Sequence, residues 1–192
     1  MIIFISICTI MIAGCGSHQT VQQKEKAEAP KSYFPIQDYL KGEIKIIDSL
    51  PVGIMRKFSS GNKRDTGFID RSTFHQLANE FTSDQLSKSA LEKQYKENAF
   101  QDETTGYFTM TYLPTTDSAP LRRVDVTVKH NPTSDRVHTV YIEKEYVLND
   151  TFVSERLFWK ANTSFTITKE KKFKDQNPVI EQLLVIWDPG EY

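Results

Sequence analysis

Apolar and polar side chains alternate along the chain from about residue 106 onward. In the segment 121–130, three valines alternate with charged and hydroxyl side chains, a pattern typical of a strand with one buried and one solvent-facing side. Segments rich in Asn, Asp and Pro separate the alternating stretches and predict short turns. We therefore expect an antiparallel meander with strands at about 106–113, 121–130, 136–147, 151–160, 163–173 and 179–187.

The preceding part of the chain shows a helical period. Apolar residues at Ile36, Leu40, Ile44 and Ile47 predict an amphipathic helix over 36–48. The segments 52–58 and 66–70 flank the turn-rich stretch 59–64, which predicts a β-hairpin. Two more helices are expected, with Ser72 and Ser83 as N-caps and apolar faces formed by Phe74, Leu77 and Phe81 and by Leu86, Ala90, Leu91 and Tyr95.

These elements predict an α+β fold in which helices pack on one face of a large twisted antiparallel β-meander sheet. Strands and helices do not alternate throughout the chain, which disfavours a doubly wound fold. Residues 183–186 are continuously apolar, so we expect the last strand to be central or covered on both faces. Residues 33–192 are long enough to form a single domain with a substantial core.

The N-terminal segment is an apolar stretch that ends in Ile12-Ala13-Gly14-Cys15. It is shorter than the ~20 residues that span a bilayer as a helix. The segment resembles the signal peptide and lipobox of a bacterial lipoprotein. The resemblance implies cleavage between Gly14 and Cys15, lipidation of Cys15 and attachment to a membrane of the bacterial cell envelope. Gly16 stands where this family has an aspartate for inner-membrane retention, which implies the outer membrane, with the domain facing the periplasm.

This resemblance divides the chain into three parts. Residues 1–14 are the expected signal peptide, and residues 15–32 are the lipidated cysteine and a disordered tether, because the segment is polar and has almost nothing large to bury. Cys8 would leave with the signal peptide, so the domain 33–192 has no thiol for a disulfide and must be stabilised by its core.

No motif of catalysis or metal binding stands out. His18, His75, His130 and His138 have no cysteine partner and no paired spacing, and there is no G-x-S-x-G elbow. We expect no metal, no cofactor and no catalytic residue, so the sequence does not favour an enzyme. The remaining possibility is a carboxylate pair with shifted pKa values among Glu143, Glu145 and Glu155. The favoured interpretation of these residues is surface pairing with Lys144 or Arg156.

Charge and aromatic residues leave several binding roles open. The net charge is −1, and nucleic acid is not an expected partner. The basic stretch 169–174, with Arg122-Arg123, suggests either an anion site or, as we favour, lysines that protect an edge strand. Trp159 and Trp187 are expected in the core or at its rim with hydrogen-bonded indoles. A sugar-stacking surface would draw on Tyr107, Tyr112, Tyr141 and Tyr146.

The sequence therefore favours a membrane-anchored envelope lipoprotein with a non-enzymatic binding or structural role and an envelope protein as its partner. The alternative is a carrier or sensor that binds a lipid or glycan within the β-meander. A third hypothesis, an enzyme acting on cell-wall or glycan material, is less favoured because no residue set indicates it.

Overall fold

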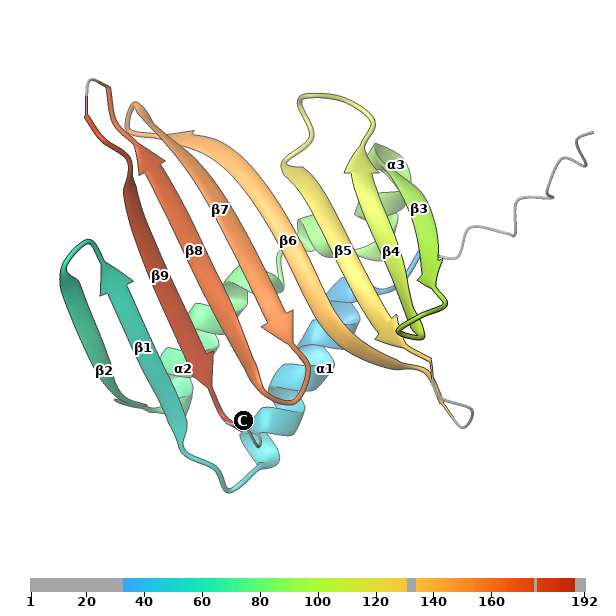
Figure 1. Cartoon of the computed structure of the whole chain (residues 1–192), viewed down its shortest axis with the longest axis horizontal. Helices are drawn as coiled ribbons and strands as arrows, with labels where there is room; N and C mark the ends of the chain where they lie inside the picture. The colour runs from blue at the N-terminus through green and yellow to red at the C-terminus, as the bar shows by residue number, and fades with distance from the viewer. Residues whose placement is uncertain (1–32, 131–133, 175, 189–192) are drawn as a thin grey trace, which may run out of the picture. The chain divides into compact units, whose positions relative to one another are not determined.

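A computed structural model describes residues 33–130, 134–174 and 176–188 (Figure 1). The expected signal peptide, the cleavage site at Gly14, the lipidation site at Cys15, the tether and His18 lie outside the described residues. The described part contains α1 (Ile36–Ser49), β1 (Ile54–Ser60), β2 (Lys63–Ile69), α2 (Arg71–Ala78), the 3-10 helices η1 (Asn79–Phe81) and η2 (Asp84–Leu86), α3 (Lys88–Gln94), β3 (Tyr95–Asp102), β4 (Tyr107–Pro114), β5 (Leu121–Lys129), β6 (Arg136–Leu148), β7 (Thr151–Lys160), β8 (Ser164–Lys172) and β9 (Val179–Ile186).

The strands form one nine-stranded sheet in the order β2-β1-β9-β8-β7-β6-β5-β4-β3. Every neighbouring pair is antiparallel. From β3 to β9 each strand pairs with the next one along the chain, and the hairpin β1–β2 is joined to the far side of β9. The predicted α+β class and antiparallel meander are therefore confirmed.

The helices lie on one face of the sheet (Figure 1), which we call the inner face. Helix α1 buries Ile36, Leu40, Ile44 and Ile47, the residues whose spacing predicts it. It ends at Ser49, shortly before Pro51, which cannot continue a helix. No helix in the described part of the chain is long and apolar enough to cross a membrane.

Aromatic side chains form the centre of the core between the helices and the inner face. Phe81 from η1 packs on Trp159 and Phe165, with ring centroids 5.2 and 5.0 Å apart. Trp159 stacks on Phe165 at 5.4 Å, and Trp187 lies 5.2 Å from Trp159. The core position predicted for both tryptophans is confirmed. The predicted indole hydrogen bonds are not, because neither buried Nε1 has a hydrogen-bond partner among the described residues.

The helical region differs from the prediction in its caps. Asp70, not Ser72, caps α2, by accepting a hydrogen bond from the Thr73 amide at 2.7 Å. Ser83 caps only the short η2, and Ser87 caps α3 by accepting from the Ala90 amide. Tyr95, predicted on a helix, is the first residue of β3, a strand that the sequence pattern does not predict.

The sheet corrects two interpretations of single strands. Strand β9 is interior, as predicted, since it lies between β8 and β1; cover on both faces is wrong at its start, where Val179 and Ile180 are exposed. Strand β8, which carries the basic stretch, lies between β7 and β9. The edge-protection interpretation of these lysines is therefore wrong, and another explanation is needed.

Candidate functional site

A row of four alternating charges crosses the inner face of the sheet. Lys144 on β6 is opposite Glu155 on β7, Glu155 is opposite Lys169 on β8, and Lys169 is opposite Glu181 on β9. We call Lys144, Glu155, Lys169 and Glu181 the charge row. Opposite charges on directly paired residues attract one another across the strands, so the row is internally compensated.

An apolar row runs beside it, and on β7, β8 and β9 its residues are two positions away from those of the charge row. Leu157 is opposite Ile167, Ile167 is opposite Leu183, and Leu183 is opposite Phe58 on β1. We call Phe58, Leu157, Ile167 and Leu183 the apolar row. Because residues two apart on a strand share a face, both rows look toward the helices.

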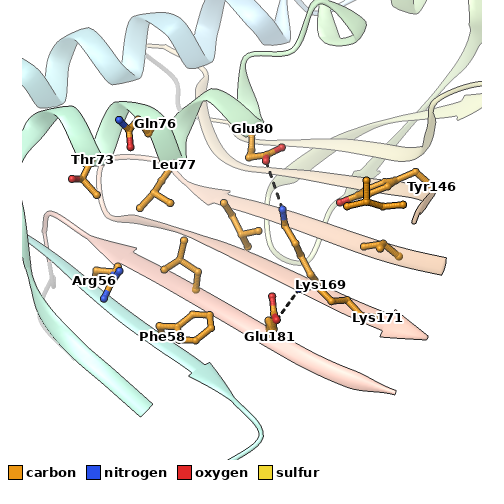
Figure 2. A pocket seen from close by; sticks show the side chains of 14 residues that line it. Arg56, Phe58, Thr73, Gln76, Leu77, Glu80, Tyr146, Lys169, Lys171 and Glu181 are labelled. Atoms are coloured by element: carbon orange, nitrogen blue, oxygen red, sulfur yellow. Dashed lines mark hydrogen bonds and ion pairs between the residues drawn. The ribbon is translucent and has the colours of Figure 1, made fainter. Parts of the chain in front are cut away.

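Helix α2 and η1 lie over part of these two rows and leave a pocket of about 430 Å³ beneath them, which we call the α2 pocket. Figure 2 shows Leu77 of α2 above the pocket and Phe58 of β1 below it. Lys169 and Glu181 bring part of the charge row into the lining, and Ile167 and Leu183 bring part of the apolar row. The pocket is therefore amphipathic, with an apolar floor next to a set of ionised groups.

Glu155 is the most buried ionisable residue of the charge row, with 2% of its side chain exposed. The Nζ atom of Lys169 lies 3.1 Å from its Oε1 atom, and Glu155 is close enough to Tyr146 to act on the pKa of that phenol. An ion pair with Lys169 offsets part of the cost of burying a carboxylate. Glu155 and Lys169 are thus the electrostatic centre of the site.

Glu80 of η1 connects the helices to this centre. Its Oε1 atom lies 3.6 Å from Lys169 Nζ, and its Oε2 atom lies 3.3 Å from Lys144 Nζ. Figure 2 shows the contact with Lys169 crossing from η1 to β8. Glu80 therefore sits above both lysines and closes one end of the α2 pocket.

The charges alter the titration of their neighbours. Burial acts to lower the pKa of Lys169, but the carboxylates of Glu155 and Glu80 outweigh it and raise that pKa above its usual value. Burial, together with the charge of Glu155, also raises the pKa of the Tyr146 phenol. Lys169 is therefore a fixed cation and Tyr146 a neutral hydroxyl at physiological pH.

Ion pairs also hold the other charged groups of the lining. Lys171 Nζ lies 2.8 Å from Glu181 Oε1, and Arg56 of β1 pairs with Asp65 of β2. Lys171 and Glu181 are each about one-third exposed and both line the pocket, so a ligand in it can reach this pair. Two lysines of the basic stretch, Lys169 and Lys171, thus face inward, and each has an acidic partner.

The structure does not bring the predicted carboxylates together. Glu155 faces the helices, whereas Glu143 and Glu145 lie on the opposite face of the sheet because they differ from Lys144 by one residue. Glu145 pairs with the cation Arg122 at 3.0 Å, in line with the interpretation that these glutamates pair with neighbouring cations. Surface pairing is wrong for Glu155, and its spacing from buried Val153, Leu157 and Trp159 is the signal that places it inside.

The histidines and tyrosines are dispersed. His75 contacts Asp48, His130 contacts Asp135, and His138 lies against the Tyr107 ring. Over the described ranges, no group of three or more His, Cys, Asp or Glu side chains is placed to hold a metal. Tyr112 is fully buried and Tyr146 faces the α2 pocket, so the four tyrosines do not form one sugar-stacking surface.

Two other hollows, of about 510 and 550 Å³, lie beside Lys144 and beside Trp187. The α2 pocket differs from them in combining a continuous apolar row with paired charges, the arrangement typical of small-molecule sites. No protein-family model, curated protein or solved structure matches this chain.

Proposed function

We propose that this chain is a lipid-anchored protein of the bacterial cell envelope with a non-enzymatic binding role, and that the α2 pocket is its binding site. The observation that carries this proposal is the apolar row next to the charge row in a pocket of about 430 Å³. That volume lies within the range of small-molecule sites. Among the alternatives, the pocket favours a carrier or sensor of an amphiphilic ligand.

The charged groups support binding more than catalysis. A general acid or base needs a titrating group that can reach the substrate. Glu155, the most buried carboxylate of the charge row, is already held in an ion pair with Lys169 at 3.1 Å. Lys169, with its raised pKa, stays protonated. These groups are better suited to fixed hydrogen bonds than to proton transfer.

The lipobox-like segment supports the location. Lipidation at Cys15 after cleavage behind Gly14 would hold the domain at a membrane, in this proposal the outer membrane facing the periplasm. The tether 15–32 would then keep the pocket at high local concentration near membrane lipids. In the same proposal the large sheet is twisted, as antiparallel sheets usually are, so that β1 and β6 curve around the two sides of the pocket.

The test compares ligands that co-purify with the mature protein and two leucine variants. Leu183 lies in the pocket and its chain neighbour Leu184 faces the opposite side of the sheet, so Leu183→Arg and Leu184→Arg make a matched pair. All three proteins are extracted from bacterial membranes in the same detergent, and bound small molecules are identified by mass spectrometry. We expect an amphiphile with the wild type and with Leu184→Arg but not with Leu183→Arg. Equal amounts in all three would refute the α2 pocket as the binding site.

A further inference from the structure

The proposed function leaves the chemical class of the ligand open, and the charges of the α2 pocket narrow it. Resting on that function, we propose that the ligand is an uncharged single-tailed amphiphile whose head group carries hydroxyls. Its tail lies along the apolar row, and its head lies between Lys171 and Glu181. A fatty acid, an anionic lipid and an alkylamine are excluded as preferred ligands.

The charged groups around the α2 pocket balance one another. The cations Arg56, Lys169 and Lys171 line it, and Lys144 adjoins them through Glu80. The anions Glu80 and Glu181 also line it, with Asp65 and Glu155 paired behind them. Four cations therefore face four anions. An added charge would stay uncompensated in a partly desolvated place, which is costly.

A charged head group would have to disrupt ion pairs that the lining already contains. An anion that binds Lys169 competes with Glu80 and Glu155, and Glu155, at 2% exposure, cannot turn to water for compensation. An anion that binds Lys171 competes with Glu181, which lies 2.8 Å away. A cation meets the same obstacle with the signs reversed. At Lys169, Lys171 and their carboxylate partners, a charged ligand thus gains one ion pair only by weakening another.

An uncharged head group with hydroxyls can form hydrogen bonds to the ion pairs without breaking them. A hydroxyl both donates and accepts, so one hydroxyl can accept from Lys171 while it donates to Glu181, and the ion pair stays intact. Lys171 and Glu181 line the pocket and are each about one-third exposed, so a ligand in the pocket can reach both groups (Figure 2). Hydrogen bonds to ionised groups are also stronger than those between neutral groups. A hydroxylated head therefore fits the paired charges.

The tail of the amphiphile fits the apolar row. Phe58, Leu183 and Ile167 continue from the charge row into the pocket, and Leu77 of α2 covers them. Such a strip can bury one hydrocarbon chain, and each CH₂ that it removes from water strengthens binding. Thr73 and Gln76 of α2 also line the pocket and offer uncharged polar contacts at its edge.

The experiment uses three probes with the same ten-carbon tail: monodecanoylglycerol, decanoate and decylamine, which are neutral, anionic and cationic. The mature lipidated protein is held in amphipol, and thermal unfolding is followed by tryptophan fluorescence. At 100 times its Kd, a ligand should raise Tm by about 5–10 °C for a domain of this size. We expect this shift with monodecanoylglycerol in wild type and Leu184→Arg, its loss in Leu183→Arg, and at least tenfold weaker binding of decanoate and decylamine.

Variants of Lys171 and Glu181 test the preference for an uncharged head group, and this test does not depend on whether Leu183→Arg folds. Lys171→Met leaves Glu181 unpaired and should shift the preference toward decylamine. Glu181→Gln leaves Lys171 unpaired and should shift it toward decanoate. The double variant should bind neither charged probe better than wild type does.

The outcomes separate the two proposals. If decanoate or decylamine binds wild type as tightly as monodecanoylglycerol does, the inference about the head group is wrong while the α2 pocket remains the site. The same holds if Lys171→Met and Glu181→Gln leave the order of the probes unchanged. If no probe distinguishes Leu184→Arg from Leu183→Arg, with both cooperatively folded, the proposed function itself fails.

Discussion

Replacing Glu155 with glutamine removes one charge from the charge row and hardly changes the shape of the side chain. The lost partner is Lys169, whose Nζ atom lies 3.1 Å from the carboxylate. At an effective dielectric constant of about 20, the attraction between two charges at this distance is about 5 kcal/mol. Lys169 is 28% exposed and keeps Glu80 as a second partner, so water and Glu80 recover part of the loss. We expect Glu155→Gln to lower the free energy of unfolding by about 3 kcal/mol, the low end for breaking a buried pair.

The measurement is urea unfolding followed by the fluorescence of the buried Trp159 and Trp187. In a domain of this size the loss corresponds to a fall in Tm of about 6–12 °C. Glu170→Gln is the matched control, because Glu170 lies on the same strand as Lys169 but on the opposite face, with exposed partners. It should lose less than about 1 kcal/mol. Equal losses in the two variants would refute the view that the charge row is desolvated. Adding Lys169→Met to Glu155→Gln should restore part of the stability, because it removes the cation that has lost its buried partner.

Four further predictions address the anchor, the sheet, the core and α2. Cys15→Ala should abolish acylation and release the protein from membranes; acylation that persists would contradict the lipobox assignment. Deletion from Val179 onward should give an aggregated chain by size-exclusion chromatography, because β9 joins β8 to β1; a monomeric, cooperatively folding truncation would contradict this. Phe81→Ala should lower the free energy of unfolding by about 3–5 kcal/mol, since the fully buried ring packs on two other aromatics, and a loss below about 1 kcal/mol would refute its core role. The backbone hydrogen bond from Thr73 lowers the pKa of Asp70 below 3.8, so its stabilisation is complete above pH 3.8 and is lost as the pH falls through the folded-state pKa. Asp70→Asn should flatten acid unfolding in that range, and an unchanged acid transition would count against the cap.

Alternating burial makes strands such as β5 predictable from the sequence, since β5 buries every second residue from Val124 to Val128. Val124, Val126 and Val128 are all buried, as their alternation predicts. Asn149, Asp150 and Asn162 adopt positive φ in the turns that border β7, a conformation that Asn and Asp tolerate better than most residues. Local chemistry of this kind is readable without knowledge of the rest of the fold.

Strand β3 escapes prediction because it buries little. It is an edge strand in which Tyr95 alone is buried, so its side chains show no alternation of apolar and polar residues. The residues before β3 contain two capping serines only four positions apart. Ser83 caps a single 3-10 turn, and Ser87 caps α3. Two short helices and a strand thus share a segment in which one longer helix is predicted.

The charge row is only partly readable from the sequence. Glu155 lies two and four residues before the buried Leu157 and Trp159, so its side chain is on the same inward face of the strand. Its pairing with Lys169 needs the register of β7 and β8, and the contact of Glu80 with Lys144 joins residues far apart in the chain. The register between neighbouring strands is set by the turns that connect them, whereas the position of η1 over the sheet is set by the packing of the whole core.

The place of β9 beside β1 has a consequence for how the chain folds. Met55 pairs with Ile186, so the β1–β2 hairpin can close locally but cannot join the sheet until the last strand has been synthesised. Pairing across most of the chain makes folding slow, because the entropy of closing the long loop is lost before the contacts form. Docking of the β1–β2 hairpin therefore waits for β9, whereas the strands from β3 to β8 can pair with their chain neighbours in the order in which they are synthesised.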